Sequence, residues 1–295
     1  MTALVAAQPS WGVLRDLFAL GKPRLSLLVL FTTGGGIWLA SRAGPSLGAL
    51  WTLAATALLV AAANALNSYI ERDIDGRMHR TRNRPLPAGR LEPRVALVAG
   101  SLAAAVALPA LAWLANPLTA LLGAAAFVLY VFIYTPMKRH TPMALVIGAI
   151  PGAMPALMGW TAVTGKAGGG GLVFFAILFF WQLPHFLAVA AYLQHDYARG
   201  GLKVFPLIYG ERATRIAATL TVVALLPVTF LPMAMDLAGW PYAVAAALLG
   251  ALFLGWALRG HSPKARAGWA RGLFLASLGY LTLLYAALIA GAHGP

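Results

Sequence analysis

Residues 47–94 read LGALWTLAATALLVAAANALNSYIERDIDGRMHRTRNRPLPAGRLEPR, an apolar run that ends in a dense cluster of charges. The first part, 47–70, is long enough to cross a bilayer as a helix. The second part, 71–94, holds four of the chain's eight acidic residues beside seven arginines. So many ions at one helix end serve no packing purpose in a chain this apolar. Carboxylates set among cations at a membrane rim are the groups that a metal-bridged phosphate ester requires.

The composition indicates a membrane protein throughout. Hydrophobic residues make up 60% of the 295 residues and charged residues only 10%, which lies outside the range of soluble domains. Runs of about 20 apolar residues recur, and each can span a bilayer. We predict an all-α polytopic membrane protein with nine transmembrane helices, at 24–41, 47–70, 94–114, 117–135, 142–163, 171–194, 213–235, 238–258 and 269–290. Only Asn116-Pro117 separates the third and fourth helices.

The basic residues fall on alternate loops, which predicts the orientation in the membrane. With a cytoplasmic N-terminus, the inner side carries 20 of the 22 lysines and arginines, and only Arg42 and Lys166 lie outside. Nine spans then place the C-terminus on the outer side of the cytoplasmic (inner) membrane. This distribution accounts for the net charge of +14 without nucleic acid as a partner. No basic region precedes a short apolar core at the N-terminus, so no signal peptide is expected, and the absence of cysteine excludes disulfides and thiolate ligands.

Four polar residues at the end of the second span share one helical face, because they are spaced by three, four and four residues. They are Asn64, Asn67, Glu71 and Asp75. The same face continues to Met78 and Arg82 if the helix persists beyond Gly76. An unsatisfied amide within the apolar region costs about 1–3 kcal/mol, and a charge at mid-membrane about 2.5–3.5 kcal/mol. Polar groups at this depth therefore usually face a cavity and serve function.

The oxygens of this face suit Mg²⁺, which prefers a few carboxylates together with phosphate oxygens and retained water. Arg82 and Arg84 follow closely and can bind phosphate oxygens in bidentate fashion. Asp73 points the other way and is expected to meet arginines of the loops. The alternative to a metal site is a network of ion pairs that caps the helix at the lipid headgroups.

A second polar stripe is predicted at the end of the sixth span. His185, Tyr192, Asp196 and Arg199 fall within about 60° of one another around a continuous helix. Because Asp75 and Asp196 both emerge on the inner side, we expect the two acidic helix ends to face a shared cavity. His185 has several possible roles, which are a packing residue, a haem axial ligand, a proton acceptor or a phosphate contact.

Further cations reach the depth of the acidic ends from other inner loops. They are Lys22, Arg24, Lys138, Arg139 and Lys203. Each either extends toward the headgroups or contacts a diphosphate. Glycines 34–36 in the first span, and Gly148, Pro151, Gly152 and Pro155 in the fifth, allow close helix contacts or a kink.

The motifs together resemble the UbiA-type intramembrane prenyltransferases, and most closely their haem-farnesylating branch. The run Asn-x-x-Asn-x-x-x-Glu-x-Asp-x-Asp is followed by Arg-Thr-x-x-Arg-Pro-Leu-Pro-x-Gly-Arg. Further similar segments are Lys22-Pro23-Arg24, Tyr134-Thr135-Pro136-x-Lys138-Arg139, Gly148-Ala149-Ile150-Pro151-Gly152, Trp181-Gln182-Leu183-Pro184-His185-Phe186 and Asp196-Tyr197. The segments keep the family's order from residue 22 to about residue 210, while the last three spans add only hydropathy.

The resemblance implies one domain, 1–295, with nine helices around a central cavity open to lipid and with catalytic loops 71–94 and 195–212 on the cytoplasmic face. It implies Mg²⁺ and transfer of a farnesyl group from farnesyl diphosphate to a vinyl group of haem b, which gives haem O and pyrophosphate. The first acidic motif maps onto Asn67, Glu71 and Asp75, and the second onto Asp196. Relatives commonly carry two adjacent aspartates in the second motif, where this chain has His195-Asp196, so a complete second metal site is in question.

The mechanism expected from this resemblance assigns a role to each group. Mg²⁺ on the acidic residues neutralises the diphosphate as the allylic C–O bond breaks, and the cations of the inner loops stabilise the departing pyrophosphate. His185, Tyr192 and Asn64 are the candidates for binding haem or positioning the acceptor. Membrane lipid and a haem A synthase or oxidase assembly proteins are the remaining expected partners.

Three other functions remain open from the sequence. The enzyme could prenylate another acceptor, such as a quinone precursor or chlorophyllide. An organic-anion transporter would also use polar groups near the membrane midplane, but it predicts polar residues on both sides, and the outer loops here hold only Arg42, Lys166 and Asp236. A non-catalytic haem-handling assembly factor would need neither Mg²⁺ nor the paired acidic motif.

Overall fold

The computed structural model describes residues 10–41, 47–262 and 268–291, and these residues form an all-helical chain. The first half comprises α1 (Ser10–Leu20), α2 (Pro23–Ala40), α3 (Leu47–Asp75), α4 (Pro93–Leu114), α5 (Pro117–Val128), the π-helical turns η1 (Leu129–Tyr134) and α6 (Thr135–Met137). The second half comprises α7 (Ala144–Thr164), α8 (Gly169–Tyr192), α9 (Gln194–Gly200), α10 (Phe205–Thr229), α11 (Leu231–Ala234), α12 (Trp240–Arg259) and α13 (Trp269–Gly291).

Nine helical segments of the described chain are long and apolar enough to cross a membrane, which confirms the predicted number. Asn116 does separate the third and fourth spans, because its side chain caps α5 by accepting a hydrogen bond from the backbone N–H of Thr119. The predicted orientation and the predicted absence of a signal peptide rest partly on residues that lie outside the described ones. These are Arg42, Lys264, Arg266, the N-terminal residues 1–9 and the C-terminal residues 292–295.

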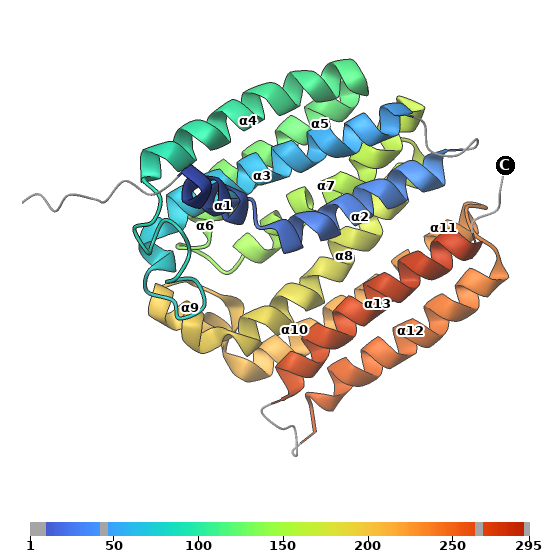
Figure 1. The fold of residues 1–295 in the computed structure, drawn as a ribbon. Helices are drawn as coiled ribbons and strands as arrows, with labels where there is room; N and C mark the ends of the chain where they lie inside the picture. Colours follow the sequence, from blue (N-terminus) through green and yellow to red (C-terminus); the bar gives the residue numbers. More distant parts are fainter. Residues whose placement is uncertain (1–9, 42–46, 263–267, 292–295) are drawn as a thin grey trace, which may run out of the picture.

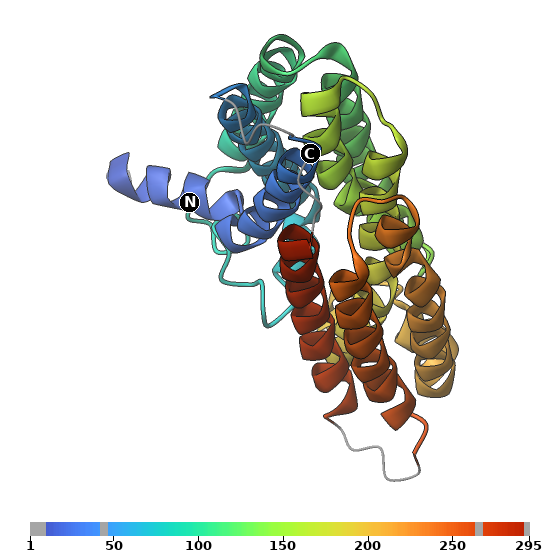
Figure 2. The same ribbon diagram turned by 90° about the vertical axis from the view of Figure 1, so that its right-hand side faces the viewer.

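The spans pack as two groups joined through α7 and α8. On one side α3 packs against α4 and α2, and α5 against α7 (Figure 1). On the other side α8 packs against α10 and α13, and α13 against α12. The largest apolar core fills this second group, and Figure 2 shows its helices running side by side. The arrangement leaves the ends of α3 and α8 near each other at the end of the bundle that also carries the loop 76–92 and α9.

Small residues of the first and fifth spans make a close helix contact, through Gly36, which was predicted, and through Gly159, which was not. Gly36 of α2 lies against the backbone oxygen of Ala156 in α7, and Gly159 of α7 lies against the backbone oxygen of Thr33. A methyl group at either glycine would overlap the facing backbone. In lipid, where apolar surface gains little from helix association, such backbone contact is a main source of packing energy. The contact fixes α2, and with it the residues that lead into α2, against the rest of the bundle.

Several local features differ from the sequence expectations. α1 was not predicted, because an 11-residue amphipathic helix is too short for a span. The seventh span begins at Phe205 and not at residue 213, although Gly210 departs from helical geometry with φ of 80°. The expected loop 195–212 is therefore largely helical, with α9 and the start of α10 inside it. α8 ends at Tyr192, so the predicted continuous stripe from His185 to Arg199 is wrong beyond that point.

Candidate functional site

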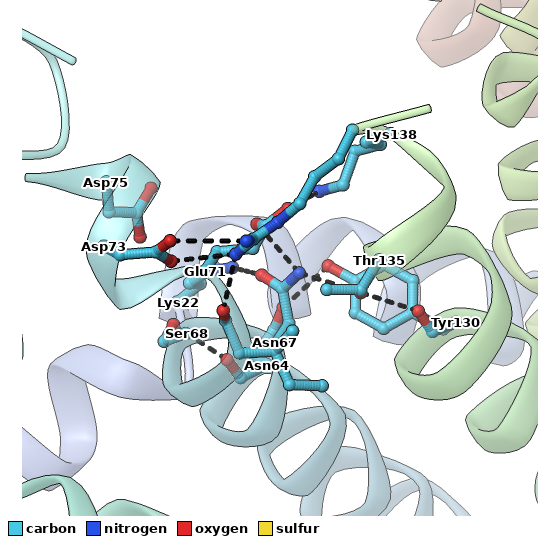
Figure 3. A network of polar contacts seen from close by, with 12 residues as sticks. Lys22, Asn64, Asn67, Ser68, Glu71, Asp73, Asp75, Tyr130, Thr135 and Lys138 are labelled. Atoms are coloured by element: carbon cyan, nitrogen blue, oxygen red, sulfur yellow. Dashed lines mark hydrogen bonds and ion pairs between the residues drawn. The ribbon is translucent and has the colours of Figure 1, made fainter. Parts of the chain in front are cut away.

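The polar residues at the end of α3 lie buried on one side of the helix, as their spacing predicts. They are Asn64, Asn67, Glu71 and Asp75, with exposed fractions between 1% and 7%. The helix ends at Asp75, where the chain turns into the loop 76–92, so the predicted face does not continue to Arg82. Figure 3 shows the side chains of this face gathered with Lys22, Thr135 and Lys138 from other segments.

Each carboxylate of this face is paired with a cation from a different part of the chain. Lys138, which follows α6, places its Nζ 2.5 Å from Glu71 Oε1. Arg84 of the loop places its Nη1 2.7 Å from Asp75 Oδ2. All four side chains are buried or largely buried, so the pairs lie in a region of low dielectric, where charge-assisted hydrogen bonds are strong.

Asn67 links the first pair to the start of α2. Its Oδ1 accepts a hydrogen bond from Lys22 Nζ at 2.6 Å, and its Nδ2 donates to Glu71 Oε2 at 2.9 Å and to Thr135 Oγ1 at 3.0 Å. Every polar atom of this buried amide thus has a partner (Figure 3). The network fixes the orientation of the amide and of Glu71 before any ligand binds.

The two lysines of the network respond differently to burial. Burial, followed by the positive charge of Arg84, lowers the pKa of Lys22 to about 7. Burial acts in the same direction on Lys138, but the Tyr134 phenol and the Glu71 carboxylate outweigh it and hold its pKa above the ordinary value. Lys138 therefore stays charged at neutral pH, whereas Lys22 titrates near neutral pH, and an anion beside it would favour its charged form.

These groups line a cavity of about 240 Å³ at the end of the bundle that carries the loop 76–92. Its ionisable lining residues are Lys22, Glu71, Asp75, Arg80, Arg84, Tyr130, Tyr134, Lys138, Tyr197 and Lys203. Five of these are lysine or arginine and two are carboxylates, so the cavity attracts anions. Lys203 reaches it because its backbone N–H donates to the backbone oxygen of Lys138 at 3.1 Å, which joins the start of α10 to the loop after α6.

Asp196 lies next to the loop 76–92, which we call the arginine loop, but does not line this cavity. Its two carboxylate oxygens accept hydrogen bonds from the backbone N–H groups of His79 and Arg80, at 2.7 and 3.1 Å. The two acidic ends thus meet on the same side of the bundle, as the sequence indicated. Asp196 holds the loop that carries Arg80, and Arg80 turns into the cavity.

Some predicted site residues are not among those that line the cavity. Arg24 is exposed, Arg82 lies 3.3 Å from the ring of His79, and Tyr192 is 46% exposed at the end of α8. Arg139 pairs with Asp73 at 2.8 Å, so the expectation that Asp73 meets a loop arginine is confirmed. The pairing directs the guanidinium to the outside of α3.

Four ionisable residues of the cavity were missed from the sequence, namely Arg80, Tyr130, Tyr134 and Tyr197. Arg80 is one of five arginines in the loop 76–92, and no spacing rule distinguishes it from its neighbours. Tyr197 follows Asp196 directly, and its position depends on the break in the chain after α8. The resemblance did point to Asp196-Tyr197 as a motif without assigning a role to the tyrosine.

A second, apolar cavity of about 340 Å³ adjoins the polar one. The residues that line both cavities are Leu25, Tyr130, Tyr134 and Phe186. The remaining lining is mostly aliphatic and aromatic, with Asn64, Gln182 and His185 among its few polar groups. Asn64 has partners of its own, because its Nδ2 donates to the backbone oxygen of Gly21 at 3.1 Å. An extended apolar chain attached to a group in the polar cavity would find a continuous apolar path here.

His185 contributes to the apolar cavity and not to the polar one. Its Nδ1 lies 2.8 Å from Ser277 Oγ, and that hydroxyl donates its own proton to the backbone oxygen of Phe274 at 2.6 Å. The hydroxyl is therefore the acceptor, and Nδ1 carries the proton. Nε2 has no hydrogen-bond partner among the described residues, so its lone pair is free. The ring is held in place by stacking on Trp181 with centroids 4.8 Å apart.

The donor set on α3 fits Mg²⁺ only in combination with a ligand. Among residues 10–41, 47–262 and 268–291, no three His, Cys, Asp or Glu side chains form a ready-made metal site. Glu71 and Asp75 nevertheless both line the polar cavity with buried oxygens, and each is held by a single cation. Mg²⁺ is usually bound by one or two carboxylates together with phosphate oxygens and water, which is the set that these residues and a diphosphate would provide.

Comparison with known proteins agrees with this geometry. The UbiA prenyltransferase family matches residues 28–278. The chain is 53% identical over 294 residues to the "Protoheme IX farnesyltransferase" of Anaeromyxobacter sp. (strain Fw109-5), covering 99% of each protein. It is 52% identical over 276 residues to the protein of the same name from Myxococcus xanthus (strain DK1622), covering 94% of each.

A solved structure shares the fold at low sequence identity. It is a UbiA homologue from Archaeoglobus fulgidus bound to GPP and Mg²⁺, and it superposes with a TM-score of 0.64 at 15% identity. The similarity covers 92% of this chain and 99% of that one. It therefore extends beyond residues 22–210, the part of the chain that holds the sequence motifs.

Proposed function

The chain belongs to the UbiA prenyltransferase family, and from this we propose that it transfers a farnesyl group from farnesyl diphosphate to a vinyl group of haem b, releasing pyrophosphate and giving haem O. The choice of donor and acceptor rests on the 53% identity, over nearly the whole of both chains, to a protein named for this reaction. The polar cavity with its cations and carboxylates, opening into an apolar cavity, supports a prenyl diphosphate as the donor.

In this proposal the cations of the polar cavity bind the diphosphate. Lys138 and Arg84 now neutralise Glu71 and Asp75, and they also face the space that a diphosphate would enter. Lys22, Arg80 and Lys203 complete the cationic lining. Their charges stabilise the departing pyrophosphate, on which negative charge grows as the C–O bond breaks. Arg24, Arg82 and Arg139 lie outside this lining and are proposed to act at most on the approach of the substrate.

Mg²⁺ would be held by Asn67, Glu71 and Asp75, and when bound it would offset the charge of the leaving diphosphate. Asp196 serves this site indirectly, because it fixes the backbone of residues 79–80 and thereby places Arg80. The carboxylate that the sequence suggested as a second metal ligand is thus assigned to positioning the loop. The substitution of His195 for a second aspartate fits this assignment, since only one carboxylate is needed for the two backbone donors.

The farnesyl chain is assigned to the apolar cavity, where Tyr134 and Phe186 mark the passage from the polar one. Excluding bulk water from this space protects the allylic carbocation from capture before it meets the acceptor. Because the product carries a hydroxyl group, one water molecule must react after the new C–C bond has formed. His185 and Asn64 line this cavity and are proposed to position the haem, whereas Tyr192 lies too far out to take part.

The membrane placement follows from the distribution of charge. We propose the cytoplasmic membrane, with the N-terminus and the polar cavity on the cytoplasmic side and the C-terminus on the outer side. This orientation gives a water-soluble diphosphate head group access to the cavity from the cytoplasm. A haem A synthase or oxidase assembly proteins, as consumers of the product, are the proposed protein partners.

The decisive experiment is incubation of the purified protein with haem b, farnesyl diphosphate and Mg²⁺, followed by mass spectrometry for haem O. EDTA should abolish the product, and re-addition of Mg²⁺ should restore it. A parallel incubation replaces haem b with a quinone precursor. Farnesylation of the quinone precursor without any haem O would refute the acceptor, and binding of haem without consumption of farnesyl diphosphate would indicate a non-catalytic haem carrier.

A further inference from the structure

The short helix α1 contacts two segments that carry cations of the polar cavity. One is the loop 76–92, with Arg80 and Arg84, and the other is the turn between α1 and α2, with Lys22. The inner side of α1 packs Leu20, which is 1% exposed, against Leu86 and Leu91 of the arginine loop and against Ala65 of α3. Figure 1 shows α1 crossing α3 beside that loop, and Figure 2 shows the helix leaning away from the bundle. The outer side of α1 leaves Leu14 and Phe18 exposed, and the apolar cluster on its inner side is formed with the loop, with α3 and with the start of α4.

One ion pair, between a buried carboxylate and a partly exposed arginine, connects α1 to the loop. Asp16 is only 2% exposed, and Arg90 Nε lies 3.3 and 3.2 Å from its two carboxylate oxygens. The same guanidinium donates through Nη1 to the backbone oxygen of Asn83 at 3.1 Å. Asn83 directly precedes Arg84, which binds Asp75 in the cavity. A short series of polar contacts therefore leads from α1 to the cavity.

A buried carboxylate with one cationic partner has a strong preference for keeping that partner. Removing the partner leaves an uncompensated charge in an environment of low dielectric. Among the described residues, Arg90 is the only cation paired with Asp16. The position of Arg90, and of the loop backbone that it binds at Asn83, is thereby tied to the position of α1.

The C-terminal end of α1 leads into the turn that carries Lys22. Gly21 and Lys22 form the turn between α1 and α2, and Lys22 adopts a left-handed conformation with φ of 49°. The backbone oxygen of Gly21 accepts hydrogen bonds from Asn64 Nδ2 at 3.1 Å and from Ser26 Oγ at 2.8 Å. This fixed turn directs Lys22 Nζ to Asn67, inside the cavity.

We propose that α1 is a positioning element of the diphosphate site, in which the Asp16–Arg90 pair holds the arginine loop while the α1–α2 turn holds Lys22. Asp16 and Arg90 do not line the cavity, so they are positioning residues that act through Arg84 and its neighbours. The inference rests on the proposed function, because it assumes that the polar cavity binds a diphosphate.

The test measures binding of inorganic pyrophosphate with Mg²⁺ to the purified full-length protein, alongside the KM values for farnesyl diphosphate and for haem b. Asp16→Asn keeps the shape of the side chain and removes its charge. We expect pyrophosphate binding to weaken, and the KM for farnesyl diphosphate to rise, by about tenfold, because Arg90 loses its charge-assisted hydrogen bonds to α1 and the loop is held less firmly. The KM for haem b should stay within about twofold of wild type, because Asp16 does not line the apolar cavity and separate sites respond largely independently.

Asp236→Asn is the matched control, because Asp236 is an exposed acid at the opposite end of the bundle, in a left-handed conformation that asparagine also tolerates. It should leave all three values unchanged. A second variant, Arg90→Lys, keeps a positive charge beside Asp16 but loses the forked contact to Asn83, and it should also weaken pyrophosphate binding. Limited trypsin digestion should cut the loop 76–92 faster in both variants than in the control.

The outcomes separate this inference from the proposed function. If the wild-type protein binds no pyrophosphate, the proposed diphosphate site fails, and the role of α1 fails with it. If the wild-type protein binds pyrophosphate and the folded Asp16 or Arg90 variant binds it equally well, only the role of α1 is refuted. An equal loss of haem and pyrophosphate binding would also refute it, because that pattern indicates a general loss of structure.

Discussion

Replacing Asp75 by asparagine tests the core of the site, because the substitution removes one charge and almost no volume. Asp75 is 1% exposed, and its Oδ2 lies 2.7 Å from Arg84 Nη1. The asparagine oxygen can still accept a hydrogen bond from Arg84. The folded protein therefore loses only the difference between a charge-assisted and a neutral hydrogen bond, which is about 1 kcal/mol.

The effect on turnover should be larger than the effect on stability. If Asp75 holds Mg²⁺ against the diphosphate, the variant loses an electrostatic contact that strengthens as the C–O bond breaks. Losses of single contacts of this kind typically reduce kcat by about 10²–10³-fold, or about 2.7–4 kcal/mol. We therefore expect haem O formation to fall by at least about 100-fold in protein that remains folded and inserted.

The assay is single-turnover haem O formation by purified protein, followed by mass spectrometry, with the melting temperature measured on the same samples. Asp73→Asn is the control, because Asp73 lies on the same helix end but is half-exposed and pairs with Arg139 outside the cavity. An exposed ion pair of this kind contributes about 0–1 kcal/mol, so the control should lose no more than about fivefold. Near-normal turnover by the Asp75 variant would remove Asp75 from the metal site.

Three further predictions concern other parts of the molecule. Gly36→Ala should destabilise the protein by about 1–3 kcal/mol, because its methyl group would overlap the backbone oxygen of Ala156, while Gly34→Ala, which meets no atom within 4 Å, should leave the melting temperature unchanged. His185→Phe should weaken haem b binding by at least about tenfold in a spectroscopic titration, or about 1.4 kcal/mol, without altering pyrophosphate binding, and an unchanged titration would exclude the ring from the acceptor site. EDTA should weaken pyrophosphate binding while leaving the haem titration unchanged, and equal pyrophosphate affinity with and without Mg²⁺ would contradict a metal-bridged diphosphate.

The acidic face of α3 could be predicted from the sequence because it depends on one helix alone. Helical geometry fixes the relative directions of Asn67, Glu71 and Asp75, and neighbouring segments have no influence on it. The nine spans could be predicted for a similar reason, since hydropathy and length are local properties of each segment. The structure confirms both.

The partners of that face could not be predicted, because they depend on where the chain turns. α3 ends at Asp75, and the following turns direct Arg80 and Arg84 into the cavity and Arg82 to His79. The five arginines of the loop 76–92 look alike in sequence, and their directions depend on how the backbone turns after Gly76. The resemblance suggested which loop matters, but it did not specify which guanidinium faces the substrate.

The position of Asp196 could not be predicted from the sequence either, because it also depends on where a helix ends. A continuous sixth helix would have placed its carboxylate on the stripe of His185, whereas the break after Tyr192 rotates it onto the backbone of residues 79–80. Because Asp196 binds two backbone donors and does not line the polar cavity, it is not placed to hold a metal there, and a single acidic residue suffices at this position. On this reasoning Asp196→Asn, which keeps one acceptor for the loop, should have the smaller effect. Its fold increase in the KM for farnesyl diphosphate should be smaller than the fold decrease in kcat caused by Asp75→Asn. The opposite order would make Asp196 a metal ligand after all.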